Sequence, residues 1–293
     1  MISIFYALGS NFSFAIASHF FTEFSRKVSP VWMNYFKATI AFFCFSSVVL
    51  LFQIPWALNQ AGFFLLASSG VIGLLIGDIF LLSAFTHLGS GRVLMIFGFQ
   101  PLILGISGYF LFQQSFEWHR LFAVLFFMLC LLSFSVESFK EKGDWQIKGI
   151  TFALIGVILD AGGILLTKKS FDMNPELSAF VANTVRSGAT MAGFFLVSLF
   201  LPKVVHLKKS FISLTVKDKR LVVFASVLGT FCSLAFYLKA IQIGHLATIS
   251  AIAGTSPLFA TIFEVLQGQK KMTAYLGVAI SSFIIGFLIL IFF

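Results

Sequence analysis

Long apolar runs separated by short polar connectors dominate the chain. A bilayer crossing takes about 20 predominantly apolar residues. Ten runs meet that length: residues 2–21, 31–52, 62–86, 92–112, 119–136, 148–167, 177–200, 221–242, 246–266 and 273–293. The runs are continuously apolar and do not alternate, and lipid cannot satisfy unpaired backbone groups, so each run predicts a helix. The pattern therefore predicts an all-α membrane protein with ten transmembrane helices.

The two halves of the chain repeat one another. Residues 71–122 align with residues 227–278 at a constant offset of 156, without a gap. An earlier stretch aligns at an offset of 149. The shared positions include Gly73/Gly229, Phe80/Phe236, Ala84/Ala240, Gly98/Gly254, Pro101/Pro257 and Gln113/Gln269, with Asn34/Asn183 and Lys37/Arg186 in the earlier stretch. Five helices per half is an odd number, so the second half enters the membrane with the opposite orientation. We expect two inverted five-helix repeats, residues 1–142 and 143–293.

Composition agrees with lipid as the main solvent. The chain is 59% hydrophobic and 11% charged, with a mean hydropathy of +1.00. A soluble domain normally carries about 25% charged residues. The net charge of +9 comes mostly from basic residues in the connectors, which favours contact with anionic lipid headgroups over binding of nucleic acid.

The basic residues are divided unevenly between alternate connectors. The odd-numbered connectors contain Arg26, Lys27, Arg92, Lys140, Lys142, Lys148, Lys203, Lys208, Lys209, Lys217, Lys219, Arg220, Lys270 and Lys271. The even-numbered connectors contain only Arg120, Lys168 and Lys169. Because cytoplasmic loops are enriched in Lys and Arg, this distribution places both termini outside the cytoplasm.

Several motifs resemble those of a known family. Residues 72–78 form a run of apolar residues with Gly73, Gly77 and Asp78, and Pro101 and Pro257 occupy matching places in the fourth and ninth spans. Residues 29–34 and 165–169 add to the likeness. The chain resembles an EamA-type transporter of the drug/metabolite transporter superfamily along its whole length. The resemblance implies a multi-pass protein of the bacterial cytoplasmic membrane with both termini in the cytoplasm, which conflicts with the charge count. The sequence departs from the family where Gly-Glu often follows the proline helices, because Gln113-Gln114 and Gln269-Lys270 stand there.

Five charged residues lie well inside the predicted spans. They are Lys37, Arg186, Asp78, Asp160 and Glu264. A charge at bilayer depth is costly, which favours a functional role; the competing interpretation is an ion pair that only fixes helix packing. We expect Lys37 and Arg186 to be repeat-related basic anchors of a central cavity, balanced by the three carboxylates. The carboxylates are also candidates for proton coupling, because a dehydrated carboxylate binds a proton more readily than one in water.

Two repeat-related prolines predict broken helices. Pro101 and Pro257 each remove a backbone hydrogen bond in mid-span. Matching helix breaks in two halves are a strong sequence pointer to a transporter binding site, although a kink of no functional consequence is the competing interpretation. The candidate substrate-binding residues are Asn34, Lys37, Asp78, Gln100, Asn183, Arg186, Thr255 and Ser256.

The sequence predicts a secondary transporter that moves a small metabolite across the membrane, with ion- or proton-coupled export favoured. An amino acid or a related anionic or zwitterionic solute fits the buried charges. A lipid-linked carrier flippase and a non-transporting scaffold are the alternatives. We expect no enzymatic activity, cofactor or metal, because the sequence contains no recognisable catalytic motif, phosphate-binding loop or metal-ligand spacing. The expected partners are the solute and membrane lipid. The fifth and tenth spans are poor in polar residues, so we expect them to be peripheral, and they are candidate homodimer contacts.

Overall fold

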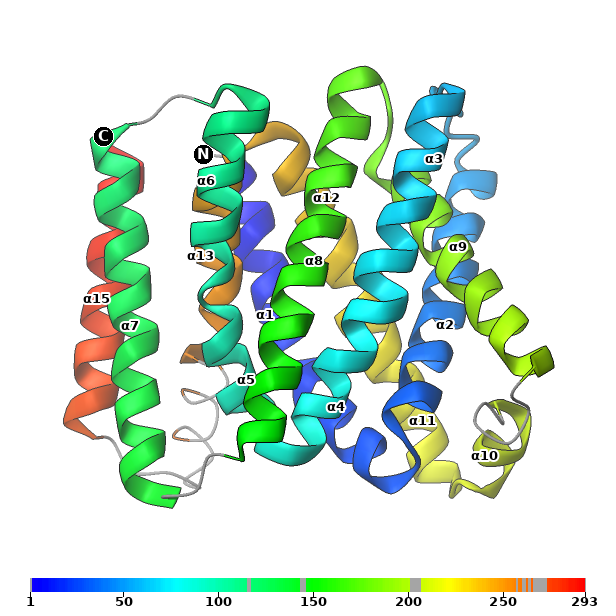
Figure 1. Cartoon of the computed structure of the whole chain (residues 1–293), viewed down its shortest axis with the longest axis horizontal. Coiled ribbons are helices and arrows are strands. Elements are labelled where there is room, and N and C mark those ends of the chain that lie inside the picture. The colour runs from blue at the N-terminus through cyan, green and yellow to red at the C-terminus, as the bar shows by residue number, and fades with distance from the viewer. Residues whose placement is uncertain are drawn as a thin grey trace.

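The computed structural model describes residues 2–114, 117–142, 146–200, 207–256, 258–259, 262, 265 and 273–292. Every regular element in this part of the chain is a helix (Figure 1). Five helical stretches of it are long and apolar enough to cross a membrane: Pro30–Leu51, Gln60–Leu88, Arg92–Phe112, Ile147–Met173 and Val216–Ile243. Shorter apolar helices lie at Leu121–Ser133 and Ala274–Leu290. The all-helical class is therefore confirmed, whereas the count of ten spans stays a prediction.

The helices follow one another in the order that the apolar runs predict. The first half contains α1 (Ile2–Lys27), α2 (Pro30–Leu51), α3 (Gln60–Ser69), the π-helical η1 (Gly70–Gly77), α4 (Asp78–Leu88), α5 (Ser90–Phe97), α6 (Gln100–Phe112) and α7 (Trp118–Lys142). The second contains α8 (Ile147–Met173), α9 (Ala179–Phe200), α10 (Leu207–Ser213), α11 (Val216–Ser226), the π-helical η2 (Val227–Cys232), α12 (Ser233–Ile243), α13 (Leu246–Gly254) and α15 (Ala274–Phe292).

The turn between α1 and α2 shows how the connectors stop and restart helices. Ser29 is the N-cap of α2, and its side chain accepts a hydrogen bond from the backbone N–H of Trp32. Pro30 follows at the first helical position, where its missing N–H breaks no intrahelical bond. The α4–α5 turn instead uses Gly89, whose φ of 83° lies in the region that side chains avoid. Both turns need few residues, so consecutive helices pack side by side.

The fourth predicted span is two helices. α5 ends at Phe97 and α6 begins at Gln100, so Pro101 lies in the first turn of α6. A proline in the first turn costs no intrahelical hydrogen bond. The break lies just before the proline, at Gly98 and Phe99. Its repeat-related partner, Pro257, lies outside the described residues.

Matching π-helical segments interrupt the third and eighth predicted spans. The repeat offset of 156 maps Gly73 in η1 onto Gly229 in η2. π-helical turns are rare and occur often at functional sites. The apolar pattern gave no sign of them, because an i→i+5 turn leaves the hydrophobicity of the run unchanged.

Equivalent helices of the two halves run in opposite directions. Figure 1 shows α1 descending from the N-terminus at the top of the view, whereas α8 rises from the bottom. Likewise α2 rises and α9 descends. These directions are those that an inverted repeat requires.

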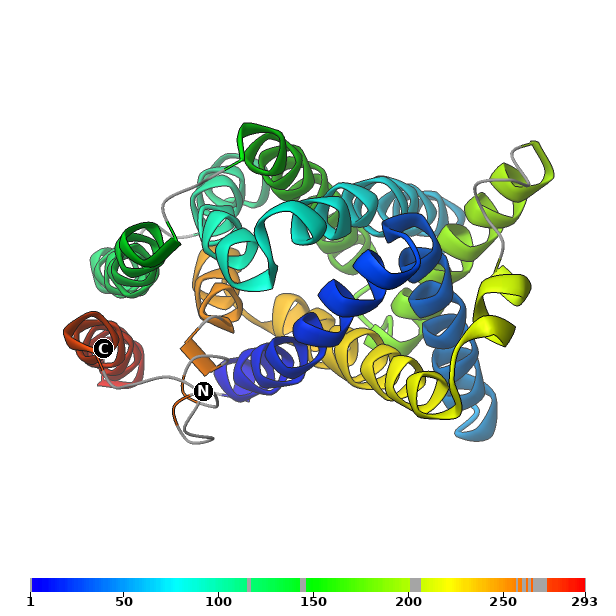
Figure 2. The same ribbon diagram turned by 90° about the horizontal axis from the view of Figure 1, so that it is seen from below.

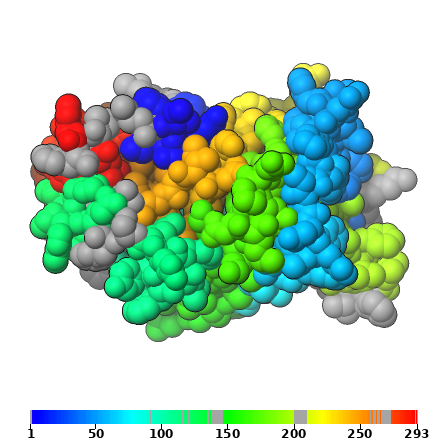
Figure 3. All heavy atoms as spheres, turned by 90° about the horizontal axis from the view of Figure 1, so that it is seen from above, coloured from blue at the N-terminus to red at the C-terminus, as the bar shows by residue number. Residues whose placement is uncertain are grey.

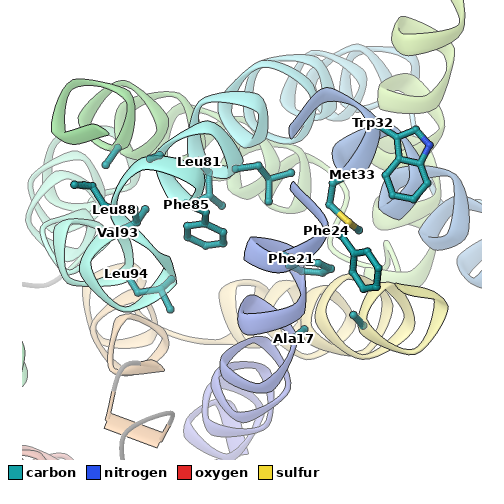
Figure 4. Packing of buried hydrophobic residues seen from close by; sticks show 14 of the residues in the cluster. Ala17, Phe21, Phe24, Trp32, Met33, Leu81, Phe85, Leu88, Val93 and Leu94 are labelled. Atoms are coloured by element: carbon teal, nitrogen blue, oxygen red, sulfur yellow. The ribbon is translucent and has the colours of Figure 1, made fainter. Parts of the chain in front are cut away.

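Two apolar clusters fill the bundle on either side of its middle. The lower cluster gathers the C-terminal end of α1, the N-terminal end of α2, and α4, α5 and α11; Figure 4 shows Phe21, Phe24, Trp32, Met33 and Phe85 within it. The upper cluster gathers the N-terminal end of α1, the C-terminal end of α12, and α6, α7 and α13, with Leu104, Phe127, Ile241 and Leu246 fully buried or nearly so. The middle of the bundle between them is where polar residues collect.

Helices α7 and α15 form a pair at one edge of the molecule. They pack against each other and lie apart from most other helices (Figure 2). In the space-filling view, α15 and part of α7 occupy the left edge (Figure 3). The sequence predicts that the fifth and tenth spans are peripheral, and these two helices hold that position.

Candidate functional site: a polar cavity between the halves

A cavity of about 120 Å³ lies between the two apolar clusters. Its walls come from both halves: α1, α2, η1, α4, α5 and the start of α6 in the first half, and α8, η2, α12 and the end of α13 in the second. Neither α7 nor α15 contributes a described lining residue. The polar and ionisable lining residues are Ser10, Asn11, Lys37, Asp78, Gln100, Asp160, Thr230, Ser233, Tyr237 and Ser256.

Lys37 and Asp78 form a direct ion pair in the cavity wall. The Lys37 Nζ donates to Asp78 Oδ2 over 2.6 Å, and the two side chains are only 5% and 10% exposed. The Lys37 Nζ also lies over the ring of Phe21, 5.4 Å from the ring centroid, and Phe21 belongs to the lower apolar cluster. One helical turn before Lys37, Asn34 donates to the carbonyls of Leu74 and Leu75 in η1. Both polar residues of this face of α2 therefore bind the third predicted span.

Among the described residues, the hydrogen-bond partner of the Asp160 carboxylate is an amide and not a cation. Gln100 Nε2 donates to Asp160 Oδ2 over 2.5 Å, which joins the start of α6 to the middle of α8. Both residues line the cavity. The bond joins the two halves of the chain, and its donor, Gln100, immediately precedes Pro101.

Arg186 lies behind the cavity wall rather than in it. Its side chain is 1% exposed, and its Nε donates to Ser69 Oγ over 3.0 Å. Ser69 in turn donates to the Gly163 carbonyl and contacts Thr167, so the guanidinium sits where α3 and η1 cross α8 and α9. Its Nη1 is buried and has no hydrogen-bond partner among the described residues.

A second polar link joins α1 to the end of α13. Asn11 Nδ2 donates to Thr255 Oγ1 over 2.7 Å and to the Ile252 carbonyl over 2.8 Å, and Ser256 Oγ donates to Asn11 Oδ1. Ser256 is equivalent to Gln100 under the repeat offset of 156. Each half thus ties the residue before its repeat proline to the first helix of the opposite half.

The structure divides the predicted site residues into three groups. Lys37, Asp78, Gln100, Asp160 and Ser256 meet in the cavity lining. A second group is buried around the cavity without lining it, namely Asn34, Pro101, Asn183, Arg186 and Thr255. Glu264 and Pro257 lie outside the described residues.

A model of the EamA-like transporter family matches residues 1–136 and again residues 147–292. The chain belongs to the EamA-like transporter family. It is therefore a multi-pass membrane protein of a transporter family rather than an enzyme family. No curated protein matches the chain. One solved structure, titled only as the crystal structure of a protein, has a TM-score of 0.76 at 15% identity and covers 99% of this chain and 95% of its own. At that identity, the likeness establishes the fold alone.

This EamA-like transporter carries cavity residues that sequence reasoning missed. Ser10 and Ser233 share a hydrogen bond of 3.1 Å between α1 and α12, and Asn11 reaches α13. Tyr237 lines the cavity with a buried hydroxyl that has no hydrogen-bond partner among the described residues. The available signal was weak, because serine and tyrosine occur in membrane helices for many reasons. Asn11 was the clearest clue, since it is an amide inside the first apolar run.

Proposed function

We propose that this EamA-like transporter is a secondary transporter that exports a small zwitterionic or anionic metabolite, such as an amino acid, across the bacterial cytoplasmic membrane. The observation that carries the proposal is the polar cavity between two apolar clusters, with lining residues from both halves. Substrate sites of inverted-repeat transporters lie near the bilayer midplane at the repeat interface.

The size and chemistry of the cavity favour a small solute. A pocket for a drug-sized ligand measures about 300 Å³ or more, whereas this cavity measures about 120 Å³. It offers an ammonium on Lys37 and carboxylates on Asp78 and Asp160, beside several hydroxyl and amide groups. A zwitterion presents both charges that such a lining can neutralise.

Proteoliposome transport tests the proposal. The purified full-length protein is reconstituted, and movement of labelled amino acids, small organic acids and amines is followed under imposed pH and sodium gradients. We expect at least one zwitterionic or anionic solute to accumulate above the level of protein-free vesicles and to lose that accumulation when the gradient is dissipated. If nothing in the panel moves under any gradient, or only a fluorescent lipid changes leaflet, the proposal is wrong.

A further inference from the structure

Among the described residues of the interior, two pairs of opposite charges are in different states. Lys37 and Asp78 are in direct contact. Asp160 and Arg186 form no direct ion pair. Asp160 instead accepts a hydrogen bond from Gln100, and Arg186 donates one to Ser69. An interior of low polarity favours direct contact between opposite charges. The unpaired state of the second pair is therefore the feature that needs an explanation.

The side chains of Asp160 and Arg186 both approach Gly73 in η1. A methyl group built on Gly73 would lie 3.7 Å from Asp160 Oδ1 and 3.9 Å from Arg186 Nη2. The two atoms are therefore no more than the sum of those distances apart. Gly73 belongs to η1, and because it has no side chain, no Cβ occupies this space beside the two groups.

Gln100 is a partner that suits Asp160 in either protonation state. A carboxamide has both donor and acceptor atoms, so its N–H₂ can donate to an ionised carboxylate and its carbonyl can accept from a protonated one. A guanidinium has only donors and suits only the ionised form. Asp160 can thus gain or lose a proton beside Gln100 without losing its hydrogen bond, but not beside Arg186.

We propose that Asp160 is the carboxylate that couples transport to protons, and that it alternates between Gln100 and Arg186. Beside Gln100 it takes a proton from water in the cavity; when it moves to Arg186 it returns that proton to water. Arg186 is 1% exposed, and its Nη1 has no hydrogen-bond partner among the described residues. This Nη1 is the donor that the Asp160 carboxylate reaches in the second position. This inference rests on the proposed function and names its coupling ion.

The other charged groups around Asp160 are poorer candidates. Asp78 already has the ammonium of Lys37 as its direct partner. Tyr237 lines the same cavity from α12 but is a phenol, which is neutral at ordinary pH. Among the described ionisable lining residues, this leaves Asp160 as the group whose charge can change at the least cost.

Infrared difference spectroscopy of the purified full-length protein between acidic and alkaline pH tests proton binding without a known solute. We expect a carbonyl band of a protonated carboxyl that Asp160→Asn removes and Asp78→Asn leaves in place. Arg186→Gln should make the band persist to higher pH, because the nearby positive charge that favours ionised Asp160 is gone. Absence of the band from the parent, or its survival in Asp160→Asn, overturns the proposal.

A matched pair of glycine variants tests the alternation. Gly73→Ala adds a methyl within 4 Å of both Asp160 Oδ1 and Arg186 Nη2, with ordinary contacts of 3.5 Å or more to its nearest neighbours, so the fold should tolerate it. Gly162→Ala lies beside Gly163 on α8 and meets nothing within 4 Å. We expect Gly73→Ala to keep the infrared band but lose accumulation driven by a pH gradient, and Gly162→Ala to match the parent in both.

The two experiments keep the failures apart. If the parent moves no solute, the proposed function fails while the infrared band still decides on Asp160. If the parent transports and Gly73→Ala does so equally well, the alternation with Arg186 is wrong. If the Asp160→Asn variant still accumulates solute under a pH gradient, Asp160 does not couple transport to protons.

Discussion

Lys37 and Arg186 show how two equivalent residues can take different roles. The offset of 149 relates them, and both are buried. Lys37 contacts Asp78, but the residue equivalent to Asp78 in the second half is Leu234, at the offset of 156. Arg186 therefore has no carboxylate at the matching position and instead contacts Ser69 in the opposite half. The two halves therefore differ in sequence at a position that carries a charge in the cavity lining, Asp78 in the first half and Leu234 in the second.

At this scale we predict that removing one member of the Lys37–Asp78 pair destabilises the fold, whereas replacing both members with apolar residues does so much less. Lys37→Met should lower the free energy of unfolding by about 3–5 kcal/mol, because it leaves Asp78 buried and unpaired. The double variant Lys37→Met with Asp78→Leu should recover most of that loss, since an apolar pair of similar volume is often as stable. Thermal unfolding in detergent measures both. A double variant as unstable as the single one would contradict the prediction, and neither variant is expected to transport.

The helices pack in different registers in the two halves. Asn34 on α2 donates to the carbonyls of Leu74 and Leu75, whereas the equivalent Asn183 on α9 donates to the carbonyl of Leu234. The offset of 156 maps Leu74 onto Thr230, so the second contact lies about one helical turn further along. The two halves thus differ in the register at which these equivalent helices pack.

Close packing of α9 against η1 gives the element-scale prediction. A methyl on Gly70 would lie 2.2 Å from the backbone oxygen of Arg186, and a backbone atom cannot move aside cheaply. Gly70→Ala should therefore destabilise the protein by about 1–3 kcal/mol. The control is Gly162→Ala, whose methyl has open space. The melting temperatures of the two variants provide the comparison, and equal values would show that α9 shifts without cost.

At the scale of the molecule, the described basic residues at helix ends lie mainly at one end. Among the described residues, Arg26 and Lys27 end α1, Lys148 begins α8, and Lys217 begins α11, all at the lower end in Figure 1. Lys168 and Lys169 near the C-terminal end of α8 lie toward the opposite end. The charge asymmetry of the sequence is thus an asymmetry of the folded molecule.

From this asymmetry we predict that the lower end faces the cytoplasm and that both termini lie outside it. A reporter that is active only in the cytoplasm should be inactive when fused after Phe293 and active when inserted at Gly143, between the halves. The inserted reporter is the control for expression. Strong activity at Phe293 with none at Gly143 would instead support the orientation that the family resemblance implies.

The sequence by itself determined the class of fold and the family. Hydrophobicity decides which segments enter lipid, and lipid forces each of them to be helical, so both can be predicted from composition segment by segment. The buried charges and the residues that precede Pro101 and Pro257 were visible for the same reason, because polar groups stand out in apolar runs. Lys37, Asp78, Gln100, Asp160 and Ser256 were found in this way.

Only the tertiary structure decided which of these groups meet. Lys37 and Asp78 are 41 residues apart, Gln100 and Asp160 are 60 apart, and Asn11 and Ser256 are 245 apart. Such contacts depend on how helices cross and on their register, which the apolar pattern does not encode because lipid-facing and packed surfaces are equally apolar. For the same reason, the sequence did not place Arg186 behind the cavity wall or reveal the π-helical segments that position its neighbours.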